Sequence, residues 1–96
     1  MEKVNNVIEM INNMDMKNRL RLAIRISDSN YTNLKYDKHE MYEKFDNQLK
    51  ELDEEYRTTI INFNKYHTIT FAMAKIMEID KNEQNKVALY LFNILN

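Results

Sequence analysis

The sequence predicts an all-α protein, a small bundle of three to four helices around one long central helix. Glycine, proline and cysteine are all absent from its 96 residues. Sheets and catalytic loops depend on glycine and proline for tight turns, so their absence favours helices joined by short polar links. A chain of this length forms one domain, which we take as residues 1–96.

The central helix is predicted over about residues 38–79 from an apolar seam whose steps alternate between three and four residues, as in a coiled coil. The seam is Tyr42, Phe45, Leu49, Leu52, Tyr56, Thr59, Phe63, Tyr66, Thr70, Met73 and Met77. A straight helix of this length measures about 63 Å, whereas a compact chain of this size is about 32 Å across. The seam therefore predicts a homodimer, in which a second copy covers Tyr42, Phe45, Leu49, Leu52 and Tyr56.

The two halves of this helix differ in the width of their apolar face. The second half adds Ile60, Ile61, Ile69, Phe71, Ala72, Ala74, Ile76 and Ile79 to the seam. Because a wider apolar face needs more neighbours, we expect the second half to lie in the core and the first half to project. The alternative is a break within residues 58–70, where β-branched and Asn residues lower the helix propensity.

Capping residues mark the other helices. A first helix is expected over residues 2–13, and Asp15 is a candidate N-cap for the next segment. Asp37 and Asp80 are each followed three residues later by glutamate, the pattern of a capping box. These two boxes predict the start of the long helix and of a last helix over residues 81–95.

Residues 16–36 fit two templates. As a helix, the segment places Met16, Leu20, Ala23 and Ile24 on one face. As a strand, its residues alternate between apolar and polar from residue 19 to 26, and a hairpin over residues 19–36 is the alternative. We favour the helix because an isolated hairpin is only marginally stable in water.

Enzyme chemistry finds no support in the sequence. It contains no Ser/His/Asp spacing and no glycine-rich phosphate loop, so we expect no enzyme activity, no cofactor and no small-molecule substrate. His39 and Glu43 stand four residues apart, but a metal site needs at least a third ligand, so no metal is expected. The absence of cysteine and of an apolar run of about 18 residues predicts a cytoplasmic protein without a membrane segment.

The charge is unevenly distributed, although the net charge is only −1. Residues 37–55 carry −5, while residues 1–36 and 56–96 each carry +2. The acidic face, Glu51, Asp53, Glu54 and Glu55, is a candidate contact for a protein partner, against the simpler reading of a solvated helix face. The basic segment, Lys17, Arg19, Arg21 and Arg25, is a candidate contact for a nucleic-acid backbone, against internal ion pairing.

Methionines offer a further surface. Met10, Met14, Met16 and Met41 could form an adaptable partner-binding surface, although filling the core is the simpler role.

These observations predict a small non-enzymatic regulator or inhibitor that binds a protein partner stoichiometrically. The 14 asparagines suit an AT-rich coding sequence, so a phage or mobile element is the expected context. Two alternatives stay open: a small DNA- or RNA-binding regulator that uses residues 17–25, and a self-assembling structural subunit.

Overall fold

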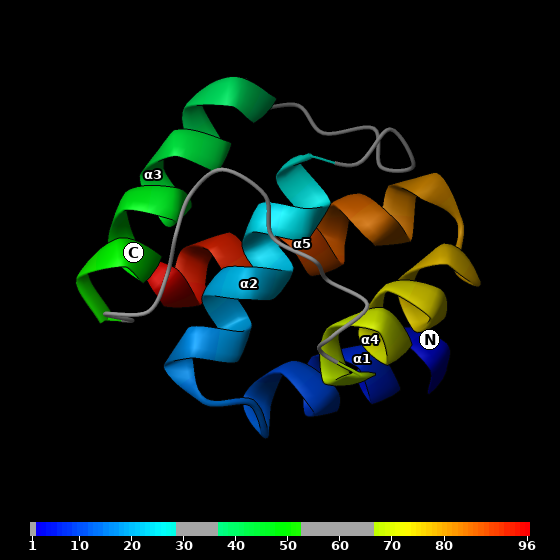
Figure 1. The fold of residues 1–96 in the computed structure, drawn as a ribbon. Coiled ribbons are helices and arrows are strands. Elements are labelled where there is room, and N and C mark those ends of the chain that lie inside the picture. The colour runs from blue at the N-terminus through cyan, green and yellow to red at the C-terminus, as the bar shows by residue number, and fades with distance from the viewer. Residues whose placement is uncertain (1, 29–36, 53–66) are drawn as a thin grey trace.

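The computed structural model describes residues 2–28, 37–52 and 67–96, and these residues form five helices and no strand (Figure 1). The helices are α1 (Glu2–Asn12), α2 (Met16–Ser27), α3 (Lys38–Leu52), α4 (His67–Met77) and α5 (Lys81–Leu95). The Cα radius of gyration is 12.4 Å. The predicted all-α bundle is therefore confirmed.

The central element of the bundle is α2, which packs against α3, α4 and α5. Its buried residues are Leu20, Leu22, Ala23, Ile24, Ile26 and Ser27. At 100° per residue these positions cover more than half of the helix circumference, so residues two apart can both be buried. This wide coverage produced the strand-like alternation in the sequence. The hairpin alternative is wrong for residues 19–27, and residues 29–36 lie outside the described part of the chain.

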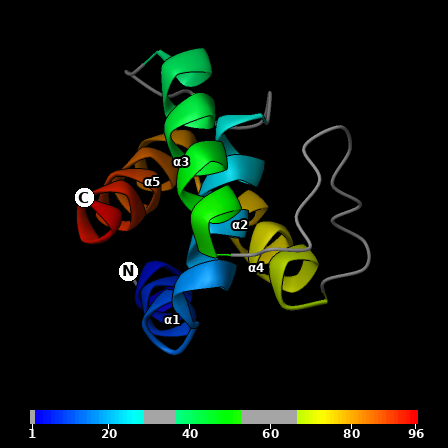
Figure 2. The ribbon, with the colours of Figure 1, turned by 60° about the vertical axis from the view of Figure 1, so that its left-hand side comes forward.

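The single long helix predicted over about residues 38–79 is not observed. Its two described parts, α3 and α4, are separate helices that run in different directions (Figures 1 and 2). The longest extent of the molecule is 37 Å, whereas a straight helix over residues 38–77 would need about 60 Å. Residues 53–66, which include the region proposed for a break, lie outside the described residues.

The first half of the predicted central helix does not project, because α3 packs along α2 (Figure 2). Phe45 and Leu49 are fully buried, and the ring of Phe45 lies 5.1 Å from the ring of Phe92 in α5, centroid to centroid. These two seam residues are covered by their own chain, so they cannot form the predicted oligomer seam. Tyr42 is half-buried, Leu52 is exposed, and Tyr56 lies outside the described residues.

The second half of the predicted central helix was expected to lie in the core, and it does so only in part. Ile69, Ala72, Met73 and Ile76 of α4 are buried, as expected of a core helix. Phe71 was expected on the same apolar face, but it is exposed.

The predicted N-caps are confirmed. Each of the three aspartates accepts a hydrogen bond from a backbone N–H at or near the start of its helix, which satisfies a donor that has no intrahelical partner. The bonds run to Asp15 from Asn18 at 2.8 Å, to Asp37 from His39 at 3.0 Å and Glu40 at 3.3 Å, and to Asp80 from Glu83 at 2.9 Å.

Gln84 forms hydrogen bonds with the C-terminal end of α4. Its side-chain amide is buried and donates from Nε2 to the carbonyl oxygens of Ile76 at 3.1 Å and Ile79 at 3.0 Å. These carbonyl groups stand at and beyond the last turn of α4, where a helix has no i+4 donor. The oxygen of Ile76 also accepts from the backbone N–H of Ile79 at 3.3 Å. The side chain of Gln84 therefore ties α5 to the end of α4.

Candidate protein-binding site

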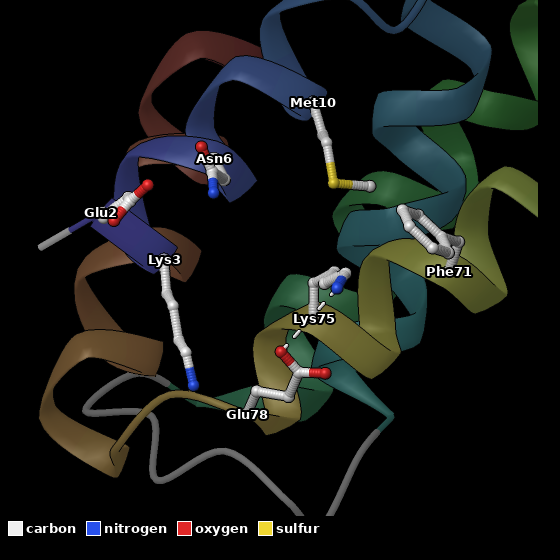
Figure 3. A pocket seen from close by; sticks show the side chains of 7 residues that line it. All are labelled: Glu2, Lys3, Asn6, Met10, Phe71, Lys75 and Glu78. Carbon is white, nitrogen blue, oxygen red and sulfur yellow. Dashed lines mark ion pairs between the residues drawn. The ribbon is translucent and has the colours of Figure 1, made fainter.

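A groove between α1 and α4 is the candidate site, and Figure 3 shows it from close by. It encloses about 440 Å³ and is lined by Glu2, Lys3, Asn6, Met10, Phe71, Lys75 and Glu78. Cavities that bind ligands in proteins enclose about 300–1,000 Å³, so this groove is large enough to receive side chains of a partner. We call it the α1–α4 groove.

The wall formed by α1 follows from helical periodicity. Val4, Val7 and Ile11 are buried against the core. Residues at spacings of three and four share a helix face, so Lys3 and Met10 fall beside this buried stripe and line the groove.

The wall formed by α4 follows from the same rule. Its core-facing residues leave Phe71, Lys75 and Glu78 on an adjacent stripe, at i, i+4 and i+7. The side chain of Phe71 is 56% exposed, the largest fraction among the large apolar side chains that the structure describes. An aromatic side chain this exposed at the edge of a groove is a typical anchor of a protein–protein contact.

The two ends of the groove differ in polarity. Met10 and Phe71 lie at one end, and Lys3 and Glu78 lie at the other (Figure 3). Lys75 joins the two ends: its Nζ lies 5.4 Å from the centroid of the Phe71 ring and 3.9 Å from Oε2 of Glu78. A cation over an exposed aromatic face stabilises the pair by about 0.5–1 kcal/mol, which favours one orientation of the ring.

The basic segment is divided between two roles. Arg19 donates from Nε to the carbonyl oxygen of Ile11 at 3.0 Å and from Nη2 to that of Asn12 at 2.9 Å. Its guanidinium group therefore caps the end of α1, where the last carbonyl groups have no intrahelical donor. Sequence reasoning grouped Arg19 with the nucleic-acid contacts, and its structural role was missed.

Lys17, Arg21 and Arg25 share the outward stripe of α2, four residues apart. Arg21 donates from Nη1 to Oδ1 of Asn18 at 2.8 Å. A recognition helix must expose the face that enters the major groove of DNA, and α2 is instead covered by three other helices. Within this stripe Lys17 is exposed, and Arg21 and Arg25 are half-buried.

The acidic face lies mostly outside the described residues. Glu51 is exposed near the end of α3, and Asp53, Glu54 and Glu55 lie in the part of the chain that the structure does not describe. Glu51, the residue of this face that the structure describes, does not line the α1–α4 groove.

His39 and Glu43 form an exposed pair, with Nε2 and Oε1 3.2 Å apart. Among residues 2–28, 37–52 and 67–96, no three His, Asp or Glu side chains are grouped to hold a metal ion. None of the described helices is long and apolar enough to cross a membrane.

A second hollow, of about 380 Å³, lies where the end of α2 meets the start of α3. Tyr42 lines it beside Asp28 and Asp46. Burial raises the pKa of the Tyr42 hydroxyl above its ordinary value, and the negative charges of Asp46 and Asp28 raise it further. The shift therefore acts in the alkaline range, where an ordinary tyrosine would lose its proton.

Of the four methionines proposed as a partner surface, the structure places only Met10 in the α1–α4 groove. Met14 is buried, Met41 packs against the core, and Met16 is exposed elsewhere on the surface. The candidate site thus combines one residue that the sequence singled out with Phe71, which it assigned to the core.

No family model, curated protein or solved structure matches this chain. Its function is therefore inferred from the geometry of the α1–α4 groove.

Proposed function

We propose that this chain is a small non-enzymatic regulator that binds a protein partner stoichiometrically, and that the α1–α4 groove is its binding surface. The exposure of Phe71 carries this proposal, because the ring stands 56% exposed beside Met10 at the apolar end of the groove. Fully burying an exposed phenylalanine side chain is worth about 1.5–3 kcal/mol, and roughly half of this gain is left for a partner at Phe71. Aromatic and methionine side chains are also enriched where partner proteins meet. The cytoplasmic setting and the phage or mobile-element context belong to the same proposal.

The balance of charge in the groove favours a protein over a nucleic acid. Glu2 and Glu78 match Lys3 and Lys75, so the lining carries no net charge. Nucleic-acid binding depends on a surplus of positive charge that displaces counterions from the phosphates. A protein surface with an apolar centre and charges of both signs at its rim fits this lining better.

The proposal is tested by affinity capture with two matched variants. Immobilised wild-type chain should retain one protein from a lysate of the source organism at a fixed molar ratio. Phe71→Ser should lose that protein. Met77→Ser should retain it, because Met77 is also exposed on α4 (48%) but does not line the groove. Equal capture by both variants would remove the groove from the proposal.

A second candidate function uses Lys17, Arg21 and Arg25, which follow one another at four-residue spacing along the outward stripe of α2. Three phosphate contacts predict a salt dependence with a slope of about −2.7 in log K against log salt concentration. A gel shift at low salt that disappears when all three become alanine would support this candidate. The absence of any shift at low salt would exclude it.

A further inference from the structure

We propose that the protein partner of the α1–α4 groove is a second copy of this chain, related to the first by a two-fold axis that runs along the groove. This inference rests on the proposed function, because it names the occupant of the same surface. The arrangement of the lining residues and the signs of their charges support it.

At each end of the groove, residues of similar polarity from the two walls lie at the same height. Met10 of α1 lies at the same end as Phe71 of α4, and Lys3 of α1 lies at the same end as Glu78, which directly follows α4 (Figure 3). The two walls therefore run antiparallel, with an apolar level at one end and a charged level at the other.

Two-fold symmetry would bring residues at the same height of the groove into contact between the two copies. In a symmetric dimer the same patch is used by both copies. An axis parallel to the groove places α1 of one copy opposite α4 of the other without shifting either along the axis. Phe71 then meets Met10 of the second copy, and Lys3 meets Glu78 of the second copy. An axis across the groove would instead set the apolar end of one copy against the charged end of the other.

The charges favour this occupant over a strongly charged foreign partner. Each wall carries one acidic and one basic residue: Glu2 and Lys3 on α1, and Lys75 on α4 with Glu78 directly after it. A patch of one sign would repel its own copy, whereas this patch sets Lys3 of one copy against Glu78 of the other across the axis. A partner of high net charge would find no surplus of the opposite sign here.

Sedimentation equilibrium of the full chain across the micromolar range tests the inference. Wild type and Met77→Glu should sediment as dimers, and Phe71→Glu should dimerise at least about tenfold more weakly, as expected for an interface anchor. Lys3→Glu and Glu78→Lys should each weaken the dimer, and the double variant should restore it. Circular dichroism of each variant checks that the helices are retained.

The outcomes separate this inference from the proposed function. A monomeric wild type at every concentration overturns the second copy as occupant, and so does a species larger than a dimer, because a two-fold contact closes on itself. Should the wild type be monomeric while Phe71→Ser loses a captured foreign protein, the inference fails and the proposed function stands. A dimer unaffected by Phe71→Glu and by the charge reversals overturns the inference, and the capture experiment then decides the proposed function separately.

Discussion

The guanidinium group of Arg19 donates a hydrogen bond from Nε to the backbone carbonyl oxygen of Ile11, at 3.0 Å. With the bond from Nη2 to Asn12 at 2.9 Å, it fastens the end of α1 to the start of α2. Because α1 forms one wall of the α1–α4 groove, Arg19 contributes to the site without lining it.

Replacing Arg19 with alanine should lower the free energy of unfolding by about 1–2 kcal/mol, since hydrogen bonds to charged donors contribute about 1.5–3 kcal/mol and this side chain is only partly buried. Lys17→Ala, on the exposed stripe of the same helix, should change it by less than about 0.5 kcal/mol. Urea unfolding followed by circular dichroism measures both. Equal losses in the two variants would contradict the capping role of Arg19.

The free energy of unfolding should fall when the side-chain N–H donor of Gln84 is removed. Gln84→Met keeps the size of the side chain but removes the bonds to Ile76 and Ile79, so we expect a loss of about 1–3 kcal/mol in the free energy of unfolding. Gln48→Met, at a half-buried position of α3, should cost less than about 0.5 kcal/mol. A Gln84→Met variant as stable as wild type would show that the amide does not hold the end of α4.

The contact of Phe45 with Phe92 predicts that α3 is held by its own chain. Phe45→Ala should lower the free energy of unfolding by about 3–5 kcal/mol, the usual range for a fully buried phenylalanine. Leu52→Ala, at a residue 46% exposed, should lower it by less than about 1 kcal/mol. Measured at several protein concentrations, the loss in Phe45→Ala should not depend on concentration. A loss that appears only at concentrations where the chain is dimeric would show that Phe45 is buried between two copies.

The raised pKa of Tyr42 predicts that the free energy of unfolding falls at alkaline pH. Its pKa is raised in the folded state, chiefly by burial and then by Asp46 and Asp28, so the folded protein holds the phenolic proton more tightly than the unfolded chain. The resulting stability is fully present below the unfolded pKa of about 10. It is lost as the pH rises through the folded pKa.

Tyr42→Phe isolates this effect, because phenylalanine has no phenolic proton to lose. The free energy of unfolding of wild type minus that of Tyr42→Phe should stay constant up to a pH of about 10 and then fall. Urea unfolding at a series of pH values measures the difference. A difference that stays flat throughout the alkaline range would contradict the raised pKa.

Helix starts could be predicted because their determinants are local. Asp15, Asp37 and Asp80 each act on backbone N–H groups no more than three residues away, which a single sequence displays directly. The last helix, predicted over residues 81–95, is observed with those bounds.

The long central helix could not be judged from its seam. A three-four spacing shows that one face of a helix is covered, but it does not show which chain covers it. Phe45 and Leu49 are buried whether the neighbour is a second copy or another helix of the same chain, and here the neighbours are α2 and α5. The spacing also gave no sign that α2 would pack against α3, α4 and α5.

The α1–α4 groove lay beyond sequence reasoning for a different reason. Its walls are separated by about 60 residues, and no periodic pattern links Met10 to Phe71. The apolar face of α4 is also wider than its buried stripe, so the sequence alone could not show that Ile69 would be buried and Phe71 exposed.

The central claim is that the surface around Phe71 binds protein, and photo-crosslinking from that position tests it most directly. A photoreactive phenylalanine analogue is placed at residue 71, or at the exposed residue Lys86 of α5 as control, and the cells are irradiated. Position 71 should give one discrete crosslinked protein, either a second copy of this chain or a single foreign partner, and position 86 should not. No adduct from position 71, or the same adducts from both positions, would contradict a binding surface in the α1–α4 groove.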